Sequence, residues 1–361
     1  MQTVNVELKG NKYPIMIGSG ILPRLGKVLK PFRLGDDAVI VTNRRVRGLF
    51  GKLIARSLAK SGISVKFFEV PDSEESKSSQ VAFDLINKIV SYDTKRKIFI
   101  IALGGGVVGD LAGYVAAIYK RGVPYIQVPT TFLAQIDSAI GGKVAIDLPT
   151  GKNLVGAFYQ PKLVYSDVAA LKTLGRRQIR NGLAEAVKYG VIRDKRLFEY
   201  IKRNRRKIFA NNTAVMTKIV LCCSKIKADV VAHDEKETKG IRTILNFGHT
   251  IGHAIETAGG YKQYHHGEAV ALGMRAAGDI SCRLGLLKKK DCLQLEDLLT
   301  ALGLPARIKK LGIKKILISM AHDKKFKAGK NRFVLLCEIG KVKIVEGVPL
   351  GVIEGAVKAR L

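Results

Sequence analysis

Short, continuously apolar segments that alternate with helical patterns constrain the fold of this chain most. Residues 38–42 (AVIVT) and 98–103 (IFIIAL) have the composition of strands buried on both faces, and residues 65–70 form a further strand between them. Helical patterns cover residues 43–60 and 78–91. Buried strands joined by helical crossovers are typical of a parallel sheet that is covered on both faces. We therefore predict a Rossmann-like α/β fold for the first half.

The pattern of the remaining residues divides the chain into two parts. Alternating residues at 4–8 and 13–17 predict an N-terminal hairpin, whereas helical periodicity dominates from about Arg176 onward. The exception lies near the C-terminus, where residues 332–336 are typical of a strand. Because the pattern changes between Leu171 and Arg177, we predict an α/β domain over residues 1–174 and a mainly helical domain over residues 175–361.

Composition excludes several classes of protein. With 47% hydrophobic and 25% charged residues in 361, the chain is typical of a folded globular protein. It contains no apolar run of about 18 residues, which predicts no transmembrane helix. Its first residues lack the basic and apolar regions of a signal peptide. Five cysteines without a Cys-x-x-Cys pair indicate reduced thiols and a cytoplasmic location.

The net charge of +32 is the unusual bulk feature. A surplus of this size raises the possibility of nucleic acid or an acidic membrane as partner. The basic residues are spread along the chain, however, and the densest groups, at 202–207 and 288–290, have the pattern of solvated helix faces. No nucleic-acid-binding motif is present. We predict no membrane partner and no specific nucleic acid, with a lysine-rich composition or an anionic substrate as the simpler explanation.

Four of the six histidines lie between residues 249 and 266. A helix from about Thr250 places His249 and His253 on one face, and a second helix from about Gly267 leaves His266 at its start. Imidazoles that converge from two elements suit a divalent metal such as zinc. Taken singly, each histidine is more simply a core or capping residue. Four in so short a span favour a metal site.

Glu185 lies among small apolar residues in a helical segment, one turn before Lys188. Burying an unpaired carboxylate is costly, so this side chain needs a partner. A metal ion and a salt bridge to Lys188 both meet that need.

The strand at 98–103 runs directly into GGGVVGD at residues 104–110. Glycines at such a turn let the backbone approach a phosphate, and the helix that follows presents unpaired amides, although a tight turn alone also explains them. Thr130 and Thr131 end the next strand, where open α/β sheets bind ligands. Lys143 and Lys152, beside glycines, suit phosphate or carboxylate, but each alone is more simply a surface residue.

These residues resemble the 3-dehydroquinate synthase family. Its members are sugar phosphate cyclases, and they catalyse the second step of the shikimate pathway. The resemblance covers nearly the whole chain. Its most specific motifs are GGGVVGD (104–110), QVPTT (127–131), GGK (141–143), GKNLVGAF (151–158), LNFGHT (245–250) and HGEAVA (266–271). It implies a cytoplasmic, homodimeric lyase whose first domain binds NAD and whose second domain binds zinc and substrate.

The resemblance also implies the cofactor ligands. Zinc, for which cobalt is a possible substitute, would be held by Glu185, His249 and His266, which leaves His253 to the substrate. The NAD site would be formed by Asp72, Glu74, Lys77, Gly105, Gly106, Val107, Val108, Gly109, Asp110, Thr130, Thr131, Lys143, Lys152, Leu171, Lys172 and Thr173.

The implied substrate is 3-deoxy-D-arabino-heptulosonate 7-phosphate, an anionic sugar phosphate. Its conversion to 3-dehydroquinate and phosphate would proceed by transient oxidation with NAD, phosphate elimination, re-reduction and intramolecular aldol closure. Arg121 would reach the neighbouring subunit's phosphate site. The other substrate contacts would be Asp137, Lys143, Asn153, Lys188, Lys227, Arg242, Asn246, His253 and one of Lys324 and Lys325.

Two other functions remain open at this point. A sibling sugar phosphate cyclase, or a metal-dependent polyol dehydrogenase, would share the glycine turn and the metal region. A carboxylate-bearing substrate is favoured by the cluster of Lys188, Lys227, Arg242, Asn246 and His253, which a dehydrogenase would not need. The other alternative is a basic nucleic-acid-binding protein with a vestigial site, and the intact set of metal and cation positions argues against it.

Overall fold

The computed structural model describes residues 1–93, 96–321 and 331–361. Contacts between residues divide the chain into two compact units. The first unit comprises Met1–Leu174 and Met216–Lys236, and the second comprises Gly175–Val215 and Glu237–Leu361. The first break therefore lies between Leu174 and Gly175, and most of helix α8 (Thr213–His233) belongs to the first unit.

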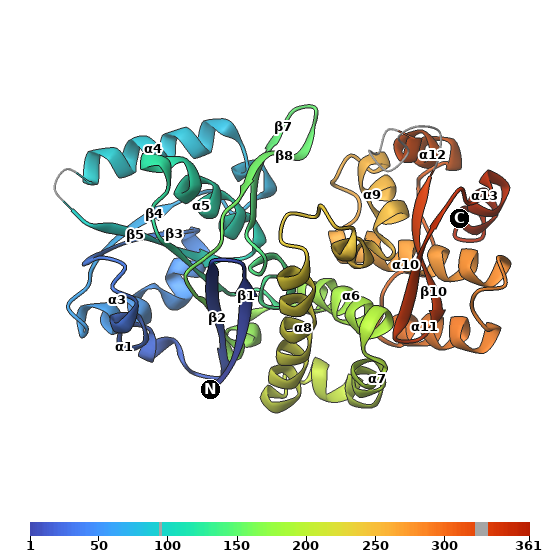
Figure 1. Cartoon of the computed structure of the whole chain (residues 1–361), viewed down its shortest axis with the longest axis horizontal. Coiled ribbons are helices and arrows are strands. Elements are labelled where there is room, and N and C mark those ends of the chain that lie inside the picture. The colour runs from blue at the N-terminus through green and yellow to red at the C-terminus, as the bar shows by residue number, and fades with distance from the viewer. Residues whose placement is uncertain (94–95, 322–330) are drawn as a thin grey trace. The chain divides into compact units, whose positions relative to one another are not determined.

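A seven-stranded sheet forms the centre of the first unit, in the order β1-β2-β9-β6-β5-β3-β4 (Figure 1). Only the N-terminal hairpin of β1 and β2 is antiparallel, and every other neighbouring pair is parallel. The Rossmann-like prediction is confirmed. The strands are β1 (Gln2–Leu8), β2 (Asn11–Gly18), β3 (Asp37–Thr42), β4 (Ser64–Glu69), β5 (Ile98–Gly104), β6 (Tyr125–Pro129) and β9 (Val164–Asp167).

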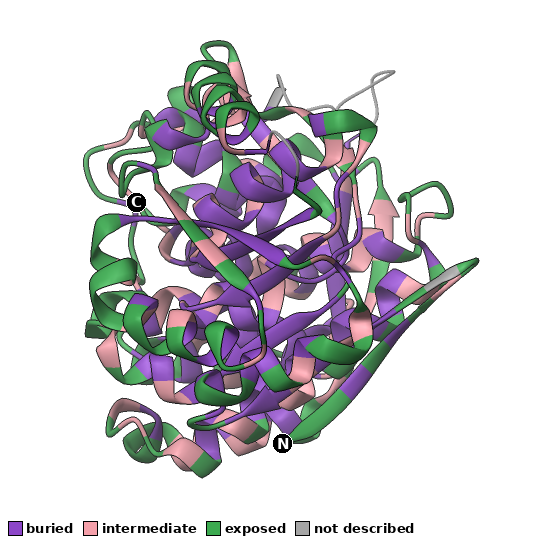
Figure 2. Cartoon of the chain, turned by 90° about the vertical axis from the view of Figure 1, so that its left-hand side faces the viewer, coloured by how far each residue is buried: buried purple, intermediate pink, exposed green. Residues whose placement is uncertain are grey.

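Helices cover both faces of this sheet, which explains the continuously apolar strands. On β3, Val39 and Val41 pack in one core cluster with residues of α4 (Ser79–Tyr92) and α5 (Gly106–Ile118). Ile40 points to the other face, where the core includes residues of α1 (Leu25–Leu29) and α3 (Lys52–Ala59). Buried residues accordingly run along the strands in Figure 2.

Two details of the first unit differ from a plain alternation of strands and helices. The helical pattern at 43–60 is divided into α2 (Arg44–Val46), a π-helical turn (Arg47–Gly51) and α3. A separate antiparallel hairpin of β7 (Lys143–Leu148) and β8 (Gly151–Phe158) packs against α5. This hairpin carries Lys143, Lys152 and Asn153.

The second unit is mainly helical, as the periodicity predicts, and it also contains a two-stranded hairpin. None of the helices in the described part of the chain has the length and apolar character to cross a membrane. The elements are α6 (Arg176–Arg193), α7 (Lys195–Phe209), η8 (Ile241–Asn246), α9 (His249–Ala258), α10 (His266–Arg283), α11 (Lys289–Ala301), α12 (Ile313–Ala321), β10 (Arg332–Glu338), β11 (Lys341–Glu346) and α13 (Leu350–Lys358).

Glycines allow α9 and α10 to pack with their backbones in contact. A Cβ atom at Gly273 would lie only 1.9 Å from the Gly248 carbonyl oxygen, and one at Gly252 would lie 3.1 Å from the backbone at Ala269. Gly248 itself has a φ of +78°, a left-handed conformation that favours glycine. The histidines of the two helices are brought together by this contact.

We predict that Gly273→Ala destabilises the second unit, because the added methyl group has no space against backbone atoms that cannot move independently. The expected loss is about 2–3 kcal/mol or more in urea unfolding followed by circular dichroism. Gly278→Ala on the same helix is the matched control, because its Cβ would be 3.5 Å from the nearest atom. That control is expected to be neutral or to gain about 0.5–1 kcal/mol from helix propensity. Equal effects of the two variants would contradict the packing argument.

Candidate functional site

The glycine turn of the first unit joins β5 to α5 and lies against the end of β6. Gly105 is the N-cap of α5 and provides no side-chain cap for the amides of the first turn. A Cβ atom at Gly105 would lie 3.0 Å from Thr131 Cγ2, and the Thr130 amide donates a hydrogen bond of 2.9 Å to the Gly104 carbonyl. The structure therefore brings the glycine turn and both threonines together at the carboxyl edge of the sheet. This is where open α/β sheets bind ligands.

Lys77 forms the centre of a polar cluster beside this turn. Its ammonium group donates to Asp110 Oδ2 at 2.7 Å, contacts Asn153 Oδ1 and lies 4.0 Å from Asp147 Oδ1. Asn153 has a left-handed backbone with a φ of +55°, and its backbone N–H donates to Asp147 Oδ1 at 2.7 Å. Burial alone would lower the pKa of Lys77, but attraction to Asp110 outweighs it and raises the pKa. Lys77 is therefore a buried cation. Asp147 is a member of this cluster that the motifs did not indicate.

The other residues of the implied NAD site lie around this cluster or further along the first unit. Asp72 accepts a hydrogen bond of 2.7 Å from Asn43, and Glu74 pairs with Lys152 at 3.0 Å. Leu171, Lys172 and Thr173 end the 3₁₀ helix η7 (Val168–Thr173), which follows β9.

Two further cations of the first unit belong to the implied substrate set. Lys227 on α8 donates to the Asp137 carbonyl oxygen at 2.7 Å and contacts the Asp137 carboxylate. Arg121 is exposed and has a φ of +64°, directly after Lys120 with a φ of +48°. Two successive left-handed residues that are not glycine store backbone strain, a feature that concentrates at functional sites.

The second unit gathers one carboxylate and two imidazoles. Glu185 from α6, His249 from α9 and His266 from α10 have ligand atoms within 4.8 Å of one another. The two Nε2 atoms lie 3.6 and 3.7 Å from Glu185 Oε1, too far for hydrogen bonds. Ligands at about 2.1 Å from a tetrahedral zinc ion would lie about 3.4 Å apart. The donor set and its spacing therefore fit a divalent metal.

The Nδ1 atoms of His249 and His266 each face a hydrogen-bond acceptor, which orients the two rings. His249 Nδ1 lies 3.1 Å from the Phe247 carbonyl oxygen, and His266 Nδ1 lies 3.3 Å from Glu256 Oε2. Partners of this kind fix the ring so that Nε2 is available to a metal. Sequence reasoning missed Glu256. The signal was present, because His249, His253 and Glu256 are spaced four and three residues apart and so share one helix face.

His253 and Glu256 form a second group of potential metal ligands with His266. The ring of His253 lies 5.3 Å from that of His249 and 6.1 Å from that of His266. His253 is exposed, whereas Glu256 is buried. The structure thus places His253 beside the Glu185 triad, at its solvent side.

Protonation in the triad is set by burial and by the surrounding charges. Burial, together with the Lys188 ammonium, holds the pKa of His249 well below its ordinary value, so its imidazole is neutral. Burial also lowers the pKa of His266, but the carboxylates of Glu185 and Glu256 outweigh it and raise the pKa to about 10. A divalent cation would compete with that proton for the imidazole.

The other sequence-predicted residues of the second unit that the structure describes lie beside Glu185 or along η8. Lys188 is buried and contacts Glu185 Oε2, so the salt bridge that the sequence left open is formed. The same carboxylate is also one of the three candidate metal ligands. Arg242 is buried and lies 3.3 Å from Glu237, and Asn246 ends η8. Lys324 and Lys325 lie outside the described residues.

Comparisons with family models and with known proteins identify the same family in both halves of the chain. Residues 67–181 match the family model for the 3-dehydroquinate synthase N-terminal region, and residues 182–326 match the model for the C-terminal region. The 3-dehydroquinate synthase of Desulforamulus reducens is 46% identical over 349 residues, which are 96% of this chain and 97% of that protein. The enzyme of Thermodesulfovibrio yellowstonii is 42% identical over 345 residues, 95% of this chain and 96% of that protein.

Solved structures of three enzymes share the fold of this chain. A 2-deoxy-scyllo-inosose synthase complexed with carbaglucose-6-phosphate, NAD+ and Co2+ superposes with a TM-score of 0.89 at 29% identity and covers 100% of both chains. A 2-epi-5-epi-valiolone synthase of Streptomyces hygroscopicus, with NAD+ and Zn2+ bound, gives 0.88 at 24% identity over 96% of both chains. An iron-containing alcohol dehydrogenase gives 0.68 at 16% identity over 97% of both chains.

We predict that Lys77→Met destabilises the first unit by about 2–4 kcal/mol, because it leaves the carboxylates of Asp110 and Asp147 without the cation between them. Adding Asp110→Asn should recover part of that loss, which a double-mutant cycle in urea unfolding without NAD measures. Lys12→Met is the control, since Lys12 and Glu7 form an exposed pair at 3.6 Å that contributes little. Additive single-variant losses would exclude the proposed coupling.

Proposed function

Because the chain belongs to the 3-dehydroquinate synthase family, we infer that it is an enzyme of the shikimate pathway that acts on a sugar phosphate as a 3-dehydroquinate synthase. Identity of 46% over 96% of the chain is the observation that carries this conclusion. We propose the complete reaction to be conversion of 3-deoxy-D-arabino-heptulosonate 7-phosphate to 3-dehydroquinate and phosphate.

We propose that the first unit binds NAD at the glycine turn. The open first turn of α5 provides amides for the pyrophosphate, and Gly105 and Gly106 let the side chains of Thr131 and Ser138 lie close to that turn. Asp72, Glu74, Lys77, Asp110, Thr130, Thr131 and Lys152 would line the rest of the site, with residues 171–173 of η7. The NAD+ present in the 2-deoxy-scyllo-inosose synthase complex supports this assignment.

We propose that Glu185, His249 and His266 hold zinc, with cobalt as a possible substitute. Two neutral nitrogens and one carboxylate leave a coordination position for substrate, as in catalytic zinc sites. When bound, NAD would supply reversible hydride transfer and the metal would polarise a substrate oxygen at which negative charge develops. Glu256 would orient His266, and the Phe247 carbonyl would orient His249.

The side chains around these groups would bind and orient the anionic substrate. Lys143, Lys188, Lys227 and Arg242 would supply positive charge for its carboxylate and phosphate, and Asp137, Asn153 and Asn246 would accept or donate hydrogen bonds. His253 is exposed beside the triad, so it can exchange a proton with solvent and with a bound hydroxyl. Lys324 or Lys325 completes the proposed set.

We propose a cytoplasmic homodimer in which Arg121 reaches the phosphate site of the neighbouring subunit. The exposed side chain and left-handed backbone of Arg121 support this assignment. None of the five cysteines, all of which lie in the described part of the chain, forms a disulfide, which is compatible with a reducing compartment.

A sibling cyclase is the second candidate, favoured by the TM-score of 0.89 to 2-deoxy-scyllo-inosose synthase. The alcohol dehydrogenases share the fold at a lower TM-score of 0.68. We expect the chelator-treated protein, supplied with zinc and catalytic NAD, to release phosphate from the heptulosonate phosphate without net consumption of NAD. No phosphate release with zinc or cobalt would exclude the synthase. Release only from a sugar phosphate that lacks the carboxylate, either a seven-carbon one or glucose 6-phosphate, would assign the sibling activity.

The metal site gives a separate prediction. His249→Ala should lose bound zinc and phosphate release together, because it removes one of three protein ligands. Glu256→Gln should keep the ligand set but weaken zinc binding about 10–100-fold, since it replaces the charged acceptor that orients His266 with a neutral and weaker one. Competition with a chelator measures both affinities, and Glu354→Gln, a carboxylate change on α13 of the same unit, is the control. Zinc-replete His249→Ala would show that His249 is not a ligand.

A further inference from the structure

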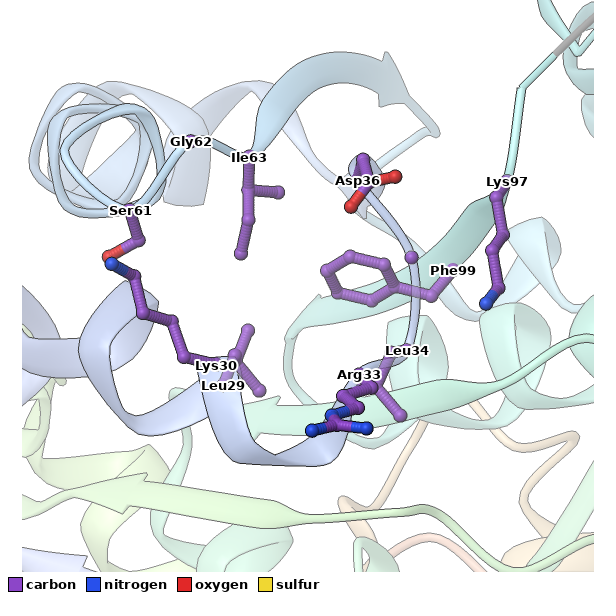
Figure 3. Close-up of a pocket in the computed structure, with 11 residues that line it drawn as sticks. Leu29, Lys30, Arg33, Leu34, Asp36, Ser61, Gly62, Ile63, Lys97 and Phe99 are labelled. Carbon is purple, nitrogen blue, oxygen red and sulfur yellow. The ribbon is translucent and has the colours of Figure 1, made fainter.

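A pocket of about 230 Å³ lies in the first unit at the amino edge of its sheet (Figure 3). Its walls come from the end of α1 and the turn after it, from the turn between α3 and β4, and from the residues where β5 begins. Because β5 is parallel to its neighbours and runs six residues from here to the glycine turn, the two sites are separated by about 20 Å. The pocket is therefore distinct from the proposed NAD site.

The inner wall of the pocket is apolar. Phe99, Leu29, Leu34 and Ile63 line it, and each is buried in the fold with a small part of its surface left at the cavity. Figure 3 shows the Ile63 and Phe99 side chains on opposite sides of the open space. Covering a surface of this kind with an apolar body removes it from water and so lowers the free energy.

The rim of the pocket is predominantly cationic. Lys30, Arg33 and Lys97 provide three positive charges, against the single carboxylate of Asp36. All four side chains are exposed, and no carboxylate among the residues that the structure describes pairs with the three cations. The cavity thus combines an apolar wall with a rim on which three cations outnumber one carboxylate.

The loop that carries these groups is held in a defined conformation. Arg33 has a φ of +48° and Gly35 a φ of +154°. A Cβ atom at Gly35 would lie 2.1 Å from the Lys97 carbonyl oxygen, so the loop rests directly against the start of β5. The Ser64 amide also donates to the Asp36 carbonyl at 2.9 Å. The rim cations are therefore attached to a backbone that is fixed by its neighbours.

We propose that this pocket binds a small organic anion with an apolar body. Pockets for drug-sized ligands have volumes of about 300–1,000 Å³, so the smaller cavity here suits a molecule with a single ring or a short branched chain. A carboxylate or phosphate group would lie at the rim with Arg33 and Lys97, and the apolar body would cover Phe99 and Ile63. The assignment is independent of the proposed enzymatic function.

Benzoate is the probe, and the isoleucine methyl resonances of the full-length protein are the readout. We expect benzoate to shift the Ile63 methyl signal saturably with an affinity in the millimolar range. Benzyl alcohol has the same ring without the charge, and inorganic phosphate has the charge without the ring. Both should bind at Ile63 at least about tenfold more weakly.

Variants test the role of the rim. Arg33→Gln with Lys97→Gln should weaken benzoate binding about tenfold or more. Lys27→Gln with Lys88→Gln removes the same charge from exposed positions outside the pocket and should leave the affinity unchanged. The proposal is overturned by an Ile63 signal that does not saturate, by equal binding of benzyl alcohol or phosphate, or by equal affinities of the two double variants. The ligand comparison needs no variant and so remains decisive if a variant fails to fold.

Discussion

The backbone contact between α9 and α10 is the constraint on which the histidine cluster depends. Helices usually pack about 8–10 Å apart, a distance set by the side chains between them. Here Gly248, Gly252 and Gly273 remove those side chains, and the left-handed Gly248 starts α9 directly against α10. The rings of His249, His253 and His266 consequently lie within 5.3–6.1 Å of one another. A wider helix separation would disperse the ligand atoms.

The first unit obeys a different constraint, which is the polarity of a parallel sheet. All carboxyl ends of β3, β5 and β6 share one edge, so Gly104–Asp110 and Thr130–Thr131 meet there although twenty residues separate them in sequence. The amino ends share the opposite edge. There the turns after α1 and α3 and the start of β5 enclose a cavity with cations at its rim. The same topology therefore creates two chemically different sites at opposite edges of one sheet.

Patterns within one segment were predictable from the sequence, and contacts between distant segments were not. The apolar run at residues 98–103 fixed β5, and the histidine spacing fixed a helix face. Glu185 lies 64 residues before His249, so its position depends on how α6 packs against α10, which no local pattern encodes. Asp147 and Asn153 meet Lys77 through a hairpin for the same reason. Family motifs supplied the assignment of Glu185, which local physics left open between a metal and Lys188.

Buried cations in both units are paired with carboxylates, which offset the free-energy cost of removing the cations from water. Lys77 contacts Asp110, Lys188 contacts Glu185, Lys227 contacts Asp137 and Arg242 lies beside Glu237. Removing a cation from water costs several kcal/mol unless an anion compensates, so these carboxylates maintain the charge at positions that would otherwise be too costly. Each of these cations is thereby already desolvated and oriented, as the proposed binding of an anionic substrate would require. Most of the lysine and arginine residues that give the net charge of +32 are not buried in this way.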